Sequence, residues 1–343
     1  MFFYSPRKYG KTSLITKVLG LLQAEGLFTI YLDLYQVPSK KVWLELYAKA
    51  ISKGVAGRIE GIKRFIKEYL PGFIPKIIIK GEDSPDIEFE YVSSRKGIER
   101  YLMDVYDLPQ KVAEKKGRKG VVVMDEFQEI RNLDGEEMEK QIRSIIQHHD
   151  KISYVFVGSK KGMLLDIFTN RKKPLYNIGK MLTLKKIPAE NMAEFIRNRF
   201  NHTQHSITEE VIEEILSLTE NHPYFTQMLC HEIWDLLFPG QDVQSKDIKE
   251  AINQILSNQS ELYFIIWDSL SPHQKNLLFA LTKTRSSRIY SADFINNHSL
   301  GSTSMIQKSI RALLNKEVIE KNEGIYEIQD VFFRQWLQTR MLP

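Results

Sequence analysis

The stretch Phe2-Phe3-Tyr4-Ser5-Pro6-Arg7-Lys8-Tyr9-Gly10-Lys11-Thr12-Ser13-Leu14-Ile15 decides the fold. It opens with a short aromatic run, typical of a buried strand, and continues through a polar turn. Apolar residues at helical spacing then extend from Thr12 to Glu25, and Gly26 follows where a helix would end. The next run, 27–34, is again apolar and strand-like. A strand, a loop, a helix and a strand in this order predict a parallel α/β sheet.

The polar turn matches most of the P-loop pattern, Gly-x4-Gly-Lys-Ser/Thr, with Ser5 in place of the first glycine. Gly10 lets the backbone approach phosphate, while the loop and the helix N-terminus present amide donors to anionic oxygens. In such a loop Lys11 contacts the β- and γ-phosphates, and the Thr12 hydroxyl binds Mg²⁺. A basic turn before a helix is the alternative. We predict a nucleotide-binding loop made of Ser5, Pro6, Arg7, Lys8, Tyr9, Gly10, Lys11, Thr12 and Ser13.

A second pattern supports the first. An apolar strand, 120–124, ends in Asp125 and Glu126. At a Walker B position Asp125 orients Mg²⁺, and Glu126 polarises the attacking water as a general base. The alternative is two solvated acids at a strand end. Ser159 follows the next strand, 152–158, where it is either a polar sensor of the γ-phosphate or a helix N-cap.

Motifs of other nucleotide enzymes are missing from the sequence. No Asn-Lys-x-Asp guanine-reading motif occurs, which disfavours a GTPase, and no Leu-Ser-Gly-Gly-Gln signature occurs, which disfavours an ABC-type ATPase. A small-molecule kinase does not usually need the Asp-Glu pair.

The rest of the chain predicts three domains. Residues 1–188 complete an α/β domain, with helices over much of 39–118 and a hairpin or extended excursion over 73–91. Residues 189–258 read as a helical lid. Residues 259–343 contain three short helices followed by two short strands around an Asn-Glu-Gly turn, which together predict a winged helix. The helices are expected at Pro272–Lys283, Ser291–Asn297 and Ser302–Asn315.

Five segments in this order resemble the archaeal-type ATPase family, which belongs to the STAND and AAA+-related P-loop ATPases. They are Gly10–Leu14, Asp125–Glu129, Gly158-Ser159, Pro174–Tyr176 and Asn221–Tyr224. The resemblance covers nearly the whole chain. It implies an AAA+-like P-loop sheet followed by a helical lid and a winged helix, with ATP or ADP and Mg²⁺ as cofactors.

The resemblance also implies two further site residues. Pro223 matches the family's Gly-x-Pro-like segment near the adenine, although Asn221 replaces the glycine, and the alternative is a simple helix-breaking turn. Related ATPases supply an arginine to the γ-phosphate, and Arg171 is the best candidate, with Arg197 and Arg199 as weaker ones. The alternative for Arg171 is a solvated loop charge. Family members usually carry a further segment before the P-loop strand that helps to frame the adenine, whereas only Met1 to Tyr4 precede Ser5 here. Either the recorded start is too late, or the protein holds adenine with fewer contacts, which is expected to weaken ATP affinity.

Composition sets broader limits on the 343 residues. The single cysteine, Cys230, excludes an internal disulfide and a cysteine-cluster zinc site, and its apolar neighbours indicate a buried hydrophobe. His202 and His205 are expected at the polar surface rather than at a metal.

No apolar run approaches the roughly 18 residues of a membrane span, and the N-terminal residues lack the pattern of a signal peptide. We expect a soluble, cytoplasmic protein that does not bind membranes.

The predicted winged helix has two candidate binding partners, DNA and a protein surface. Its third helix offers Gln307, Lys308 and Arg311 to a DNA groove. However, residues 261–343 contain ten Lys and Arg against eight Asp and Glu, and phosphate contacts dominate DNA affinity. Packing on the ATPase core, or binding to a protein partner or to another copy, is therefore favoured over DNA.

Together these patterns predict an ATP-binding and ATP-hydrolysing switch that couples nucleotide state to the position of the winged helix. The alternative is a nucleotide-holding scaffold or DNA-associated regulator with negligible turnover.

Overall fold

The computed structural model describes residues 1–35, 37–56, 59–70, 73–80, 84–91, 97–284, 288–322 and 324–341. The chain divides into two compact units, Met1–Lys185 and Lys186–Pro343. Each unit has its own hydrophobic core, and each is described by itself.

A five-stranded sheet forms the centre of the first unit, in the order β2-β5-β6-β1-β7, and every pairing is parallel. Because parallel strands end at the same edge, the loops that follow β1, β5 and β6 meet there. This arrangement confirms the predicted P-loop sheet. The strands are β1 (Phe2–Tyr4), β2 (Phe28–Asp33), β5 (Gly120–Asp125), β6 (Ile152–Gly158) and β7 (Met181–Thr183).

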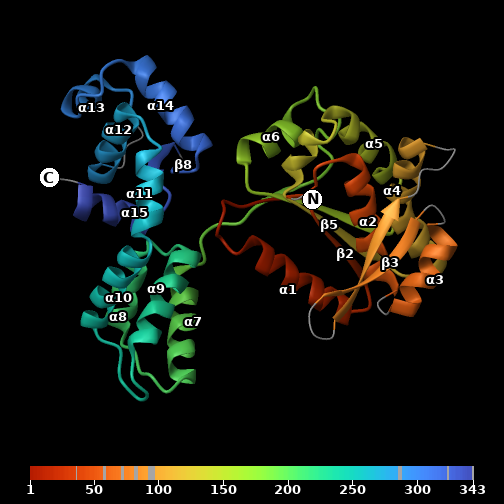
Figure 1. Ribbon diagram of the computed structural model, residues 1–343, viewed down its shortest axis with the longest axis horizontal. Coiled ribbons are helices and arrows are strands. Elements are labelled where there is room, and N and C mark those ends of the chain that lie inside the picture. The colour runs from red at the N-terminus through yellow and green to blue at the C-terminus, as the bar shows by residue number, and fades with distance from the viewer. Residues whose placement is uncertain are drawn as a thin grey trace. The chain divides into compact units, whose positions relative to one another are not determined.

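Helices cover both faces of this sheet, which explains why its central strands are apolar throughout. Along β5, Val121 and Val123 pack with Ile15 and Leu19 of α1, whereas Val122 and Met124 belong to the larger core on the opposite face. The helices of the first unit are α1 (Lys11–Ala24), α2 (Lys40–Ala56), α3 (Ile59–Tyr69), α4 (Gly97–Lys116), α5 (Glu136–Ile146) and α6 (Lys161–Thr169), with a 3₁₀ helix, η1 (Phe127–Asn132). Figure 1 shows β2 and β5 among these helices.

The stretch 73–91 forms a hairpin, so the first of the two predicted alternatives is right. Strands β3 (Phe73–Lys80) and β4 (Ser84–Tyr91) pair antiparallel, with Phe73 opposite Tyr91. The predicted turn at 81–83 and the wing residue Glu323 lie outside the described residues.

The second unit begins with helices α7 (Ala189–His202), α8 (Glu209–Leu218), α9 (Pro223–Leu236) and α10 (Ser245–Asn258), which lie side by side (Figure 1). A winged helix follows, and its three helices and hairpin confirm the prediction. The elements are α11 (Ser260–Asp268), α12 (Pro272–Lys283), α13 (Ala292–Asn297), α14 (Thr303–Asn315), β8 (Ile319–Asn322), β9 (Ile325–Ile328), α15 (Val331–Trp336) and a π-helical turn, η2 (Leu337–Met341).

The lid helices and the winged helix share one hydrophobic core within the second unit. Phe225 of α9, for example, packs edge-on against Phe332 of α15, with ring centroids 5.8 Å apart. The division of this unit at residue 258 stays a prediction. None of the helices in the described part of the chain combines the length and apolar character that a membrane crossing requires.

Candidate functional site

The loop between β1 and α1 has the backbone shape that the P-loop pattern predicts. Gly10, the residue before α1, lies in the left-handed region at φ 80°, and Lys8 does so at φ 64°. A Cβ at Gly10 would meet no atom within 4 Å, so the backbone conformation, and not crowding, calls for glycine. The first amides of α1 follow directly. Because these N–H groups have no partner within the helix, the loop ends in a site suited to an anion.

Ser5, which stands in place of the usual glycine, anchors the start of this loop. It is fully buried, and its backbone N–H donates to the carbonyl of Gly158 at 3.3 Å. Its hydroxyl donates to the carbonyl of Pro6 at 3.0 Å. The loop is therefore attached to the end of β6, the strand that precedes Ser159.

Asp125, the last residue of β5, is 2% exposed and accepts hydrogen bonds from three donors. The donors are the Thr12 hydroxyl at 3.2 Å, the Tyr31 hydroxyl at 2.8 Å and the Glu126 backbone N–H at 2.8 Å. The Lys11 ammonium lies 3.3 Å away. Burial, together with the Asp125 charge, raises the pKa of Tyr31, so this hydroxyl stays a donor.

Glu126 has a left-handed backbone, with φ 51° and ψ 41°, which turns its side chain toward the P-loop. One carboxylate oxygen accepts from Lys11 at 2.5 Å; the other accepts from the Ser159 hydroxyl at 2.9 Å and from the Gln128 amide. Burial alone raises the pKa of Glu126, but the Lys11 ammonium and these hydrogen bonds hold it below its ordinary value. Glu126 is thus an ionised carboxylate whose basicity is reduced by Lys11.

Ser159 does not cap the helix that follows it, so the N-cap alternative is wrong. Helix α6 begins at Lys161, and Lys160 occupies its N-cap position. Ser159 instead lies beside Glu126, and its role as a γ-phosphate sensor stays a prediction.

These side chains face a cavity of about 480 Å³. The P-loop residues Pro6, Arg7, Lys8 and Gly10 to Ser13 line it together with Asp125 and Glu126, as do Tyr31, Asp33 and Tyr35 at the carboxyl end of β2. Tyr9, which was predicted with them, is buried and does not line it. The structure therefore brings the predicted residues of the P-loop and the Walker B strand to one place. The cavity is also large enough for a small polar ligand.

The cavity residues fit Mg²⁺. The Thr12 hydroxyl and the Asp125 carboxylate, 3.2 Å apart, are oxygen ligands of the kind that this ion prefers. Mg²⁺ usually takes few protein ligands together with phosphate and water. In line with this, the described part of the chain holds no group of three or more His, Cys, Asp or Glu side chains that could bind a metal on its own.

The remaining predicted site residues lie elsewhere. Arg171 is exposed in the turn after α6 and does not line the cavity. Arg197 bonds to Glu209, and the Arg199 guanidinium stacks 5.2 Å from the ring of Phe195. The assignment of an arginine finger stays a prediction.

Pro223 belongs to the second unit, whereas the rest of the predicted site belongs to the first. It is the first residue of α9, after the N-cap His222, so Asn221 to Pro223 is a turn between two helices. The proximity of Pro223 to adenine stays a prediction.

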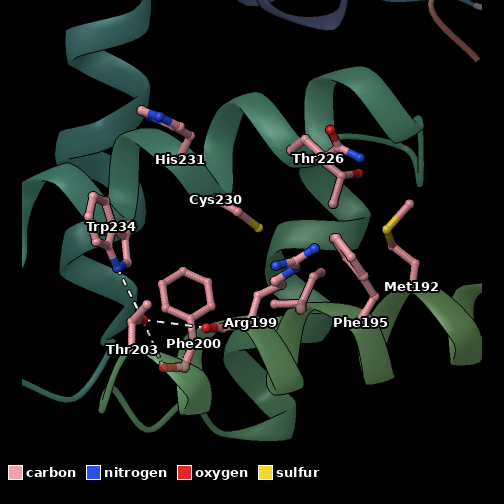
Figure 2. A pocket seen from close by; sticks show the side chains of 11 residues that line it. Met192, Phe195, Arg199, Phe200, Thr203, Thr226, Cys230, His231 and Trp234 are labelled. Carbon is pink, nitrogen blue, oxygen red and sulfur yellow. Dashed lines mark hydrogen bonds between the residues drawn. The ribbon is translucent and has the colours of Figure 1, made fainter. Parts of the chain in front are cut away.

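A second cavity, of about 390 Å³, lies between α7 and α9 (Figure 2). Figure 2 shows the Cys230 thiol directed between the two helices, and the Trp234 indole donates to Thr203 at 3.1 Å. Burial raises the pKa of Cys230 to about 12, which fits a hydrophobe and not a nucleophile. His205, by contrast, is buried and bonds to the Gln241 carbonyl at 2.8 Å, so its predicted surface position is wrong.

Sequence reasoning gave no role to Tyr31 or Gln128. Tyr31 lies on β2, which pairs with β5, and its hydroxyl is one of two in an otherwise apolar run, beside that of Thr29. Gln128 is fully buried although it is polar. A Cβ at Gly158 would lie 2.1 Å from the Gln128 side-chain oxygen, so a glycine there makes room for this amide.

The first unit has the fold of a P-loop ATPase of the AAA+ type, and a winged helix lies at the C-terminal end of the second unit. A family model described as "ATPase domain predominantly from Archaea" matches residues 1–229. Another, described as "Probable winged helix domain", matches residues 261–339. The chain belongs to this family of ATPase domains found predominantly in Archaea, as its motifs predicted.

Two solved structures show the same fold. The Walker-type ATPase PABY2304 of Pyrococcus abyssi is similar with a TM-score of 0.64 and 18% identity, over 98% of this chain and 90% of that one. The ORC2 protein of Aeropyrum pernix, in its ADPNP-ADP complexes, is similar with a TM-score of 0.52 and 13% identity, over 99% of this chain and 88% of that one. A search of curated proteins found no significant match.

Proposed function

We propose that this protein binds ATP with Mg²⁺ and hydrolyses it to ADP and phosphate. The observation that carries the proposal is the convergence of Lys11, Thr12, Asp125 and Glu126 on one cavity at the end of the P-loop. A lysine, a hydroxyl and two carboxylates in this arrangement are the groups that phosphoryl transfer to water requires.

Each residue of the cavity has a separate role in the proposed reaction. The amides at the start of α1 and the Lys11 ammonium hold the phosphates, and Lys11 leaves Glu126 in doing so. Thr12 and Asp125 would hold Mg²⁺, which neutralises charge on the phosphate oxygens. Without Lys11 beside it, Glu126 becomes a stronger base, and its carboxylate takes the proton of the attacking water. Ser159 and Gln128 keep the carboxylate oriented.

Lys11→Ala tests the binding step. Lys11 exchanges one charge-assisted hydrogen bond, to Glu126, for contacts to both the β- and γ-phosphates, so its net contribution is about one such bond, or about 1.5–3 kcal/mol. ATP affinity measured by calorimetry should therefore fall roughly 10- to 100-fold. Lys17→Ala is the matched control, since Lys17 is exposed on the same helix. Unchanged affinity in Lys11→Ala would overturn the proposed nucleotide site.

We further propose that the nucleotide state sets the position of the winged helix, which makes the protein a switch. The proposal keeps the division into an ATPase domain (1–188), a lid (189–258) and a winged helix (259–343). Its support is the shared core that joins the lid helices to the winged helix, because any movement of the lid carries the winged helix with it. Hydrogen exchange of α12–α15 with and without a nonhydrolysable ATP analogue tests it.

A second candidate is a nucleotide-holding scaffold with negligible turnover. The observation in its favour is that Lys11, Gln128 and Ser159 together donate hydrogen bonds to both oxygens of Glu126. These bonds lower the ability of the carboxylate to accept a proton from water. Steady-state phosphate release separates the two functions. Phosphate release, by the protein alone or only with an added partner, favours the enzyme, whereas no release in either case favours the scaffold.

The winged helix gives a weaker indication of a partner. Gln307, Lys308 and Arg311 are exposed on α14, but the near-balanced charge of this region favours a protein partner or self-association over DNA. A gel-shift series at rising salt tests DNA, and the absence of retardation at low salt would exclude it.

A further inference from the structure

The turn between α8 and α9 has an unusual backbone. Glu220 and Asn221 are both in the left-handed region, each at φ 54°. Asparagine tolerates this region, whereas glutamate seldom adopts it, so surrounding contacts must hold the turn in place. Two of these contacts are local: the Asn221 backbone N–H donates to the Leu216 carbonyl at 2.8 Å, and the Glu220 N–H donates to Ser217 at 3.2 Å.

The turn also holds the first residues of the second unit. The Lys186 ammonium donates to the Glu220 carbonyl at 2.8 Å. The Asn221 side-chain amide donates to the Ile187 carbonyl at 2.6 Å. These two residues are the segment through which the chain enters the second unit from the ATPase domain.

The same turn contacts the winged helix through a side chain. The Glu220 carboxylate pairs with the guanidinium of Arg334 on α15, 114 residues later in the chain. Their side chains are only 18% and 16% exposed, and burial lowers the pKa of Arg334. The two charged groups are therefore largely shielded from water. Separating them would leave each charge without compensation in a poorly hydrated site, so their relative geometry is fixed.

We propose that the Glu220–Asn221 turn is a joint that transmits the position of the entering segment, 186–187, to the winged helix, and that Glu220 and Arg334 are its positioning residues. The turn's backbone and the Asn221 amide hold the segment, while the Glu220 carboxylate holds α15. A displacement of the segment therefore acts on α15 through one short chain of polar contacts. This inference rests on the proposed switch function and names the residues that perform the coupling.

Arg334→Gln tests the joint, with Arg334→Lys as the conservative rescue. The matched control is Glu209→Gln, which breaks another ion pair of the second unit, that with Arg197, away from the joint. Hydrogen exchange is followed in α14 and α15 with and without a nonhydrolysable ATP analogue, alongside analogue affinity and melting temperature.

We expect the analogue to change exchange in α14 and α15 in wild type and in Glu209→Gln. Arg334→Gln should lose most of this change while its analogue affinity stays within about twofold, and Arg334→Lys should recover part of it. A change in hydrogen exchange as large in Arg334→Gln as in wild type would overturn the proposed joint. No response in wild type, despite analogue binding, would instead overturn the switch function itself.

Loss of stability is a separate effect and is controlled by a second variant. Arg334→Gln removes the cation beside the largely buried Glu220 carboxylate, which can destabilise the unit. The double variant Glu220→Gln with Arg334→Gln removes both charges and leaves the backbone contacts of the turn in place. If the single variant melts markedly lower than wild type, the test is made with the double variant. Loss of the analogue-induced change in hydrogen exchange then supports the proposed joint, and retention of that change overturns it.

Discussion

Replacing Glu126 with glutamine should tighten the binding of ATP. The Lys11 ammonium donates to Glu126 at 2.5 Å, and the two side chains are 8% and 20% exposed. ATP must break this bond before Lys11 can contact phosphate. The Glu126 carboxylate therefore competes with the nucleotide for the lysine.

The size of the effect follows from the strength of the bond. A hydrogen bond between charged groups contributes about 1.5–3 kcal/mol, and one to a neutral amide contributes about 0.5–1.5 kcal/mol. With glutamine at position 126, the free-energy cost of separating Lys11 from this side chain should fall by about 1–1.5 kcal/mol. This corresponds to roughly 5- to 10-fold tighter ATP binding. The contact between Lys11 and Asp125 is present in both proteins and cancels. Removal of a negative charge near the triphosphate acts in the same direction.

Calorimetry with a nonhydrolysable ATP analogue and Mg²⁺ measures this difference directly. Glu129→Gln is the control, because it removes a nearby negative charge that pairs with Lys160, at 2.9 Å, and not with Lys11. We expect its affinity to stay within about twofold of wild type. In a parallel assay, Glu126→Gln should lose phosphate release although it binds ATP. Equal or weaker binding by Glu126→Gln would refute the competition between Glu126 and the nucleotide.

Three further predictions concern single side chains. Tyr31→Phe removes the bond to Asp125 and should cost about 1 kcal/mol, or roughly 2–4 °C in melting temperature, whereas Tyr35→Phe, at an exposed position, should cost nothing measurable. Glu139 is fully buried, and among the described residues its carboxylate oxygens have no hydrogen-bond partner. The Arg131 guanidinium lies 3.8 Å away, but burial outweighs its charge and raises the pKa of Glu139. The ionised form is therefore disfavoured in the folded state, and stability should fall as pH rises through the raised pKa. Glu139→Gln should lack this loss and melt about 2–4 °C higher at pH 7 but not at pH 4; equal melting at both values would contradict the reasoning. Because burial raises the pKa of Cys230 to about 12, a thiol reagent at pH 8 should label the folded protein on the order of 100-fold more slowly than the protein in guanidinium.

Local patterns in the sequence were sufficient to predict most of the elements. The apolar run at 120–124, the helical spacing after Thr12 and the Asn-Glu-Gly turn each depend on neighbouring residues, so their periods indicate strand, helix and hairpin directly. The short helices η1 and α15, of six residues each, were not predicted. His205 was assigned to the surface on its polarity, whereas its carbonyl partner is supplied by Gln241, far along the chain.

The sequence by itself determined the class of this protein and the motifs of its site. The P-loop, Asp125 with Glu126, and the winged helix are all contiguous segments whose chemistry depends on residue order. Only the tertiary structure decided which side chains act on one another. Lys11 meets Glu126 across 115 residues, and Tyr31 meets Asp125 across 94. These pairings depend on the order of the strands in the sheet, which places β6 between β1 and β5 and β2 beside β5, and no local period in the sequence specifies that order.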